Sequence, residues 1–501
     1  MSRHPDPVRL GLDLGTQSAR AVAVDAGGRV LAAASRPLHS SRTGARHEQD
    51  PEEWWHALAA ACREALAGID PGRVTALAID GTSGTILLAG PDGTPLTPGL
   101  MYDDGRAAEQ AVRVNEVGAA VWEELGYRTM QPSWALPKLV WLLEHSAAAT
   151  APGTRLLHQV DLVTWRLAGR QVASDASHAL KTGYHLLAEG WPEKELAALG
   201  VPGVLLPEVV RPGTVLGTVC ADAARATGIP EGVEIVAGMT DGCAAQIGAG
   251  ALAPGAWNSV LGTTLVLKGT SSRLVRDPGG LVYCHRGPGD TWLPGAASSS
   301  GAGALTREFP GADLAQLTER AVKSSRSAGR GHDPVAYPLA GTGGERFPFR
   351  APDARPFLLG DPADEAERFH AHLLGVACLE RLCFDYLDHL GAPVDGPLTL
   401  TGGGTRNAYW NQLRADVLGR TVTLPEQAEG ALGMAVLAAT ADGTPLTEAA
   451  TAMVRVRTEH HPDPERTARF LPAYVAFVDA LNDHGWPAPD VAEHAVRKAQ
   501  Q

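Results

Sequence analysis

The chain has 501 residues, of which 44% are hydrophobic and 20% are charged, and its formal net charge is -13. This length exceeds what one hydrophobic core usually supports, so the sequence predicts two large domains with a ligand-binding cleft between them. The acidic balance, with no basic stripe to offset it, argues against a nucleic-acid-binding protein.

Targeting signals and clusters of metal ligands are not evident in the sequence. Residues 1–10 hold no apolar signal core, and no segment reaches the roughly 18 uninterrupted apolar residues of a membrane span. We therefore expect a cytoplasmic protein without a membrane partner. The six cysteines are scattered and are expected to be buried apolar side chains. The histidine pairs His370/His372 and His460/His461 lack companions for a metal site and are expected at exposed positions.

The chain opens with three predicted antiparallel strands, over residues 8–13, 19–25 and 30–35. A helix follows from Pro51 to about Gly68, with Asp50 as its N-cap and Glu53 completing a capping box. A buried strand is predicted over residues 74–80. This β-β-β-α-β order differs from the alternation of a dinucleotide-binding fold.

The same pattern is predicted to restart in the second half of the chain. Strands are expected over residues 257–261 and 264–269, a helix over 364–390, and a strand over 398–401. Residues 105–230 are predicted to be mostly helical and to form an addition to the first domain. We place the two domains at residues 1–250 and 251–501.

Two glycine-hydroxyl turns suit the binding of phosphate. In the first, Gly15 lets a ligand approach the backbone, Thr16 and Ser18 offer hydroxyls and N–H groups, and Asp13 can hold a hydrated divalent cation. An ordinary hairpin is the alternative for this turn. The segment 262–264 repeats the arrangement, and two facing hairpins would clamp a polyphosphate from both sides.

Asp241 is the candidate general base. It ends an apolar run and begins a helix of small residues, which would place its carboxylate to take a proton from a hydroxyl group. A plain N-cap is the alternative. The segments 80–84 and 102–106 are dense in groups that bind hydroxyls, as a polyol substrate requires, although both would also suit turns.

A third glycine segment, residues 401–412, reads as a strand, a glycine turn and a helix. Its glycines would let a flat ligand lie against the backbone, and Asn407 could bond to the ligand's edge. The small-residue helix after Glu429 is its expected companion, or else a close helix contact. The sequence has no Gly-Lys pair, so a lysine-bearing P-loop is absent.

In this order the motifs resemble those of the FGGY carbohydrate kinases, which share a duplicated domain with actin, hexokinase and the Hsp70 chaperones. The resemblance covers nearly the whole chain and rests on residues 13–18, 49–55, 239–242, 261–264 and 401–404. It implies an α/β fold of two ribonuclease H-like (actin/hexokinase/Hsp70-type) domains with a cleft between them.

The resemblance also implies roles for individual residues in an ATP-dependent sugar kinase. Asp241 would be the general base, and Asp13 would bind Mg²⁺. The ATP phosphates would be held by Gly15, Thr16, Gln17, Ser18, Arg20, Gly262, Thr263 and Thr264, and the adenosine by Gly402, Gly403, Gly404 and Asn407. The sugar would be held by Asp80, Gly81, Thr82, Ser83, Asp103, Asp104, Arg106, Asp241 and Gly242.

Within that family the chain looks most like the D-ribulokinase branch, near the xylulokinases. The segments 262–268, 283–286, 295–298 and 344–349 carry this likeness, and residues 80–84 replace the Met-His-Gly-Gln type of segment typical of xylulokinases. The resemblance therefore predicts conversion of D-ribulose to D-ribulose 5-phosphate, by a monomer or homodimer. A kinase of D-xylulose or another polyol, and a non-catalytic ATP switch like actin or Hsp70, are the alternatives.

Overall fold

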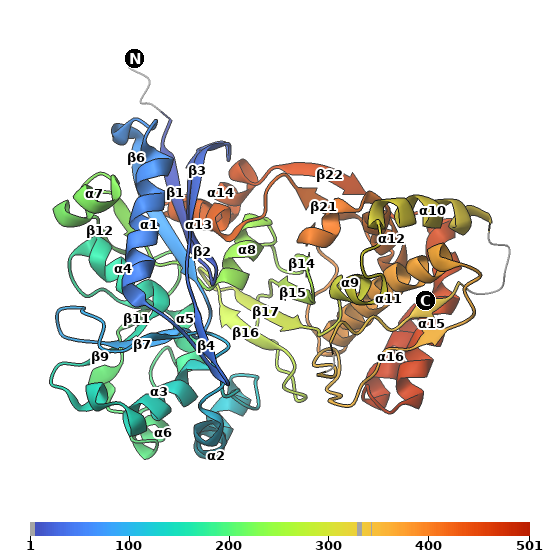
Figure 1. The fold of residues 1–501 in the computed structure, drawn as a ribbon, viewed down its shortest axis with the longest axis horizontal. Helices are drawn as coiled ribbons and strands as arrows, with labels where there is room; N and C mark the ends of the chain where they lie inside the picture. The colour runs from blue at the N-terminus through green and yellow to red at the C-terminus, as the bar shows by residue number, and fades with distance from the viewer. Residues whose placement is uncertain (1–5, 328–332, 342, 501) are drawn as a thin grey trace.

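The computed structural model describes residues 6–327, 333–341 and 343–500, and these form two lobes, each built on a mixed sheet (Figure 1). The first sheet has, in spatial order, β12 (Val215–Thr218), β13 (Glu234–Val236), β6 (Val74–Gly81), β1 (Val8–Leu14), β2 (Ser18–Asp25) and β3 (Val30–Pro37). The second has β16 (Tyr283–Arg286), β17 (Trp292–Ala297), β15 (Leu265–Gly269), β14 (Trp257–Leu261), β20 (Leu398–Thr401), β21 (Val422–Pro425) and β22 (Val456–His460).

The two sheets repeat one topology. β1, β2 and β3 form an antiparallel meander, and β6 and then β13 lie parallel on the other side of β1. β14, β15 and β17 form the equivalent meander, and β20 and then β21 lie parallel on the other side of β14. The predicted α/β fold with a duplicated domain is confirmed.

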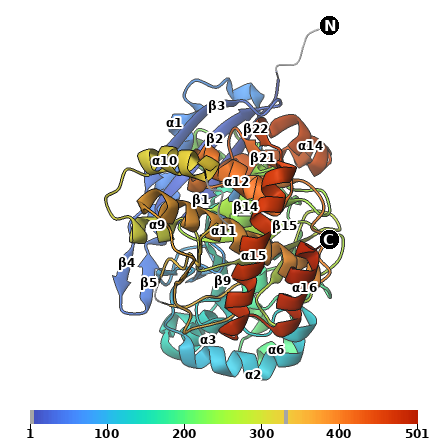
Figure 2. The ribbon, with the colours of Figure 1, turned by 90° about the vertical axis from the view of Figure 1, so that its right-hand side faces the viewer.

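Helices and short strands complete the two lobes, as a view from the side of the second lobe shows (Figure 2). The first half contains α1 (Pro51–Leu66), α2 (Ala108–Glu124), α3 (Ala135–His145), α4 (Gln159–Ala168), α5 (Ala176–Ala179), α6 (Glu193–Ala198), α7 (Ala221–Thr227) and α8 (Asp241–Gly248). The second half contains α9 (Gly303–Glu308), α10 (Leu314–Ser327), α11 (Glu365–His389), α12 (Ala408–Leu418), α13 (Gly430–Ala438), α14 (Leu446–Met453), α15 (Pro464–Asp483) and α16 (Pro489–Ala499). The short strands are β4 (Ser41–Thr43), β5 (Arg46–Gln49), β7 (Ile86–Ala89), β8 (Gly99–Leu100), β9 (Arg155–His158), β10 (Ser174–Asp175), β11 (Val209–Val210), β18 (Val335–Ala336) and β19 (Leu358–Leu359).

The first sheet is covered on both faces, so all seven residues of β1 are buried, Arg9 and Asp13 among them. Leu10 and Leu12 pack with α1 on the outer face, whereas Val22 and Ala78 pack with α8 and α13 on the inner face. Helix α13 comes so close that a Cβ on Gly11 would overlap the backbone of Ala431. The small-residue helix after Glu429 therefore makes a close contact, between β1 and α8.

Helix α13 belongs to the second half of the sequence but packs on the first sheet (Figure 1). Helix α14 follows it into the same apolar cluster. The division of the chain at residues 250 and 251 stays a prediction, and these two helices cross it in space.

The predicted elements that flank the candidate site match the structure, but three details were wrong or missed. Glu53 forms no capping box, because its carboxylate accepts a hydrogen bond from the His39 backbone N–H. His370 and His372 are buried on α11 rather than exposed, since the helix is enclosed on nearly all sides. The small sheet β4-β5-β8-β7-β9 was not predicted.

The six cysteines are free thiols, five of them buried. In the described part of the chain we find no helix suited to crossing a membrane.

Candidate active site

Three carboxylates lie at or just beyond the carboxyl-terminal ends of three neighbouring parallel strands of the first sheet, β1, β6 and β13. Asp13 and Asp80 are the penultimate residues of β1 and β6 and face each other in the parallel register. Thr240, which forms a bridge with Gly81, brings Asp241 to the same edge as the first residue of α8. Because parallel strands end together, residues far apart in the sequence meet here.

Asp80 is the most enclosed of the three carboxylates. It is fully buried, and its carboxyl interacts with that of Asp13, the facing residue of β1. A Cβ on Gly430, the first residue of α13, would lie 2.8 Å from Asp80 Oδ2. This position places Asp80 beside Asp13 and a helix N-terminus, which attracts negative charge.

Burial raises the pKa of Asp80 well above its usual range, and the negative charges of Asp13 and Asp241 raise it further. Burial also raises the pKa of Asp13, while Arg20, whose Nη1 lies 3.6 Å from Asp13 Oδ2, opposes that shift. A carboxyl whose pKa is raised keeps its proton to a higher pH than a free aspartic acid. A cation bound at this edge would favour the ionised forms of both groups.

The two predicted phosphate turns occupy equivalent places in the two sheets. The turn Gly15–Gln17 joins β1 to β2, and the turn Gly262–Thr264 joins β14 to β15. Each is closed by a glycine N–H that donates to a backbone carbonyl, Gly15 to Ser18 and Gly262 to Thr264, at 3.1 and 3.0 Å. Gln17 and Thr263, at the tips, are exposed. Both turns are thus tight hairpins with accessible tips.

The glycine turn after β20 packs on the end of β14, next to the second phosphate turn. Gly402 has a φ of 85°, and a Cβ on it would lie 2.6 Å from the Leu261 backbone oxygen. Gly404 is also close to Leu261, whereas a Cβ on Gly403 would meet nothing within 4 Å. Only glycine fits at Gly402, because both the backbone conformation and the close contact exclude a side chain.

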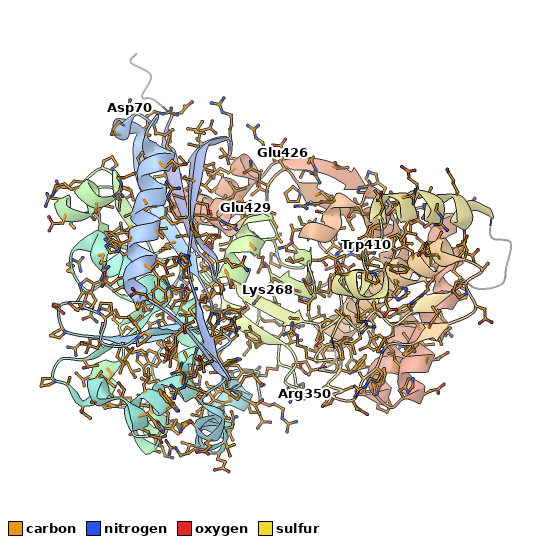
Figure 3. All side chains as sticks on the ribbon, in the orientation of Figure 1. Asp70, Lys268, Arg350, Trp410, Glu426 and Glu429 are labelled. Atoms are coloured by element: carbon orange, nitrogen blue, oxygen red, sulfur yellow. The ribbon has the colours of Figure 1, made fainter. Side chains whose placement is uncertain are left out.

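A cavity of about 530 Å³ lies beside this turn, in the second lobe. Its lining is mostly apolar and includes Leu305, Phe369, Trp410 and Gly404 (Figure 3 labels Trp410). Asn407 lies at the wall, where Oδ1 accepts from the Trp410 N–H and Nδ2 donates to Thr318 Oγ1 at 2.9 Å. A flat apolar ring next to polar edges is the kind of ligand that this cavity fits.

If this cavity takes the adenosine that the resemblance implies, Gly402→Ala should raise the KM for ATP roughly tenfold, because the strain of the turn would shift the cavity wall and the adjacent turn at residues 262–264. Gly403→Ala is the matched control, since the same methyl group would enter open space one residue away. Steady-state kinetics at saturating sugar would measure both variants. Equal KM values for the two would show that the glycine turn does not shape the ATP site.

Several residues predicted to hold the sugar are bound within the protein instead. Asp104 is fully buried and accepts hydrogen bonds from Arg106 and from the His47 N–H, while Arg106 also binds Glu48. Thr82 is buried, and its N–H and hydroxyl both donate to Gln159 Oε1. Asp104, Arg106 and Thr82 therefore stabilise the loops around the site and present no open group to a ligand. Gly81 and Asp80 are buried as well.

Asp103 remains partly open at the same loop, with about a third of its side chain exposed. Its carboxylate binds the His47 ring and accepts from Arg42 Nη2 at 2.8 Å. Burial alone would raise the pKa of Asp103, but His47 and Arg42 hold that pKa below its usual range. Asp103 is therefore an ionised acceptor at neutral pH.

Asp241 is exposed, and its Oδ1 accepts a hydrogen bond from the Gly242 N–H at 2.7 Å. Thr240, not Asp241, occupies the N-cap position of α8. The other Asp241 carboxylate oxygen is thus available to a ligand at the sheet edge. This is the arrangement that a general base for a hydroxyl group needs.

The residues around Asp241 that sequence reasoning missed are His178, Lys181, Lys268 and His285. His178 lies on the short helix α5, and Lys181 lies two residues beyond its end. Helix α5 is tied to α8 because the Ser177 hydroxyl accepts from the Thr240 N–H. Lys268 lies between the two lobes on the hairpin of the second sheet (Figure 3). They carry no local motif, so only the three-dimensional contacts could identify them.

Comparisons with known proteins agree with this geometry. Residues 8–248 match the model of the FGGY family of carbohydrate kinases, N-terminal domain, and residues 258–441 match its C-terminal domain. A xylulose kinase of Streptomyces coelicolor is 33% identical over 88% of this chain and 89% of its own length, and a glycerol kinase of Alkalilimnicola ehrlichii is 31% identical over 87% and 90%. The crystal structure of xylulose kinase from Rhodospirillum rubrum matches with a TM-score of 0.83 at 26% identity, over 95% of this chain and 99% of that chain.

Proposed function

We propose, from the premise that the chain belongs to the FGGY family of carbohydrate kinases, that its substrate is a ketopentose and that D-ribulose is the preferred one. The family is one of carbohydrate kinases, which are phosphotransferases. For this reason the alternative of a non-catalytic ATP switch is not retained. The product would be D-ribulose 5-phosphate, formed on the terminal C5 hydroxyl.

The observation that carries the proposal is the place of Asp241, exposed at the edge of the first sheet beside the phosphate turn of β1 and β2. In the proposed reaction, Asp241 orients the C5 hydroxyl and accepts its proton as the oxygen attacks the terminal phosphorus of ATP. The bond from that phosphorus to the oxygen bridging it to the middle phosphate breaks, and ADP leaves. The two glycine turns donate backbone N–H groups to the phosphates, and the cavity beside Gly404 takes the adenosine.

Mg²⁺ fits the donor set at the sheet edge. In proteins Mg²⁺ usually keeps several waters and is held by one or two carboxylates together with phosphate oxygens. Asp13 would hold the ion, with the carboxyl of Asp80 facing it in the sheet. When bound, the ion would reduce the negative charge of the phosphates.

Two observations bear on which sugar is used. Residues 80–84 differ from the Met-His-Gly-Gln type of segment, which favours D-ribulose. The relatives named xylulose kinase favour D-xylulose as the second candidate. We further propose that the protein acts in the cytoplasm as a monomer or homodimer, with sugar and ATP as its partners.

An ADP-release assay with D-ribulose, D-xylulose, L-ribulose, glycerol, ribitol and gluconate would test the proposal. We expect D-ribulose to give the highest kcat/KM, with D-xylulose second. A higher value for D-xylulose would transfer the assignment to that sugar. Preference for glycerol, ribitol or gluconate would contradict a ketopentose kinase.

A further inference from the structure

Three buried polar atoms, one after β6, one on α5 and one on β16, have no hydrogen-bond partner among the described residues: Ser83 Oγ, His178 Nε2 and His285 Nε2. A buried polar atom without a partner destabilises the protein, so several such atoms on neighbouring segments require an explanation. A sugar, with an oxygen on every carbon, would supply partners to such a group of atoms.

His178 is fully buried on α5, and a hydrogen bond to Asp175 fixes one side of its ring. Its Nδ1 lies 2.7 Å from Asp175 Oδ2, so the Nδ1 proton is donated to that carboxylate. The opposite atom, Nε2, lies 3.7 Å from where a Cβ on Gly81 would be, at the end of β6. The ring therefore directs Nε2 toward the edge that carries Asp80 and Asp241.

His285 is buried on β16, and its tautomer follows from its neighbour. Lys268 Nζ lies 3.0 Å from His285 Nδ1, and because an ammonium group can only donate, Nδ1 must accept. The ring proton is then on Nε2, which is a fixed donor. The Lys268 stem passes beside α8, with Cε 3.6 Å from a Cβ built on Gly242, next to Asp241.

The two histidines approach one region from the two halves of the chain. Helix α5 contacts β16, and Lys181, two residues beyond α5, donates to the Ser83 backbone oxygen at 3.0 Å. Burial lowers the pKa of His285 well below its usual range, and the positive charges of Lys268, Lys181 and His178 lower it further. His285 is therefore neutral and close to the other three groups.

We propose that His178 and His285 are sugar-binding residues whose Nε2 atoms hydrogen-bond to substrate oxygens beside Asp241. Asp175 and Lys268 are positioning residues, because each holds the Nδ1 atom of its histidine and so fixes the direction of the Nε2 atom. This inference rests on the proposed function, because it needs a hydroxylated substrate at Asp241. It adds a contact from the second lobe, so the sugar would be held from both sheets.

The test compares sugar and nucleotide affinity in His285→Phe, His285→Gln and Lys268→Met. We expect His285→Phe to raise the KM for the sugar roughly tenfold or more, with the Kd for ADP unchanged. His285→Gln, which keeps an N–H donor, should recover part of the loss, and Lys268→Met should give a smaller rise. His178→Phe and His178→Gln should repeat the first two results. His372→Gln is the matched control, a buried histidine whose ring binds the Arg368 backbone oxygen on α11.

An unchanged sugar KM in His285→Phe, or a parallel loss of ADP binding in all the His285 and Lys268 variants, would overturn the inference. If His285→Phe is the one variant that fails to bind ADP, the sugar KM values of His285→Gln and Lys268→Met test the inference in its place. The measurement uses whichever sugar the wild-type protein phosphorylates best. A best substrate that is no ketopentose would therefore contradict the proposed function and still leave the two histidines open to this test.

Discussion

Replacing Asp241 by Asn is expected to lower kcat for sugar phosphorylation roughly 100-fold or more while the Kd for ATP stays within about twofold. The amide can still accept a hydrogen bond but cannot take a proton at neutral pH. The Oδ1 contact to the Gly242 N–H can persist in the variant, so α8 should begin as it does in the wild type. Rapid-quench or steady-state measurement of ADP formation, with separate titration of ATP, checks both parts.

The matched control for Asp241→Asn is Asp92→Asn, the same change in an exposed turn where Asp92 accepts from the Thr94 N–H. Its turnover should equal that of the wild type. A near-normal kcat in Asp241→Asn would remove Asp241 from the role of base. An equal loss of ATP binding would instead indicate that its charge organises the sheet edge.

The fold could be predicted because it depends on local patterns, and the residues proposed for the centre of the site lie within the same patterns. Each half begins with a strand, a glycine-hydroxyl turn and a second strand, and the hydrophobic periodicity of these segments identifies them. Asp13, Gly262 and Asp241 stand at or next to the ends of such segments, where the chain turns and polar groups can face a ligand. The ends of these strands can therefore be predicted from the sequence, and so can the residues that lie there.

The rest of the site depends on contacts between distant segments. Asp104 and Arg106 look like binding groups in sequence, but the approach of His47 and Glu48 from the small sheet closes them off. His285 looks like an isolated histidine until Lys268 on the neighbouring hairpin fixes its tautomer. The burial of His370 could not be predicted either, because its helix α11 is enclosed by elements that are distant in the sequence.

The second large effect is expected at a buried ion pair that joins three elements of the second lobe. Arg414 on α12 donates to both Glu380 oxygens, on α11, and to the Ser259 hydroxyl, on β14. Arg414 and Glu380 are both fully buried. Arg414→Met would leave the Glu380 carboxylate in the core with only the Ser259 hydroxyl as a donor. We expect a loss of about 3–5 kcal/mol in the free energy of unfolding.

Urea unfolding of three variants separates the charge from the packing. The double variant Arg414→Met/Glu380→Met removes both charges and should recover much of the loss, because an apolar pair of similar volume leaves nothing ionised in the core. Arg225→Met breaks an exposed pair with Asp222 on α7 and should change stability by less than about 0.5 kcal/mol. If the double variant were as unstable as Arg414→Met, lost packing around α12, and not the unpaired Glu380 charge, would explain the defect. The effect should reach function too, since Ser259 lies two residues before Leu261, against which the glycine turn of the proposed ATP site packs.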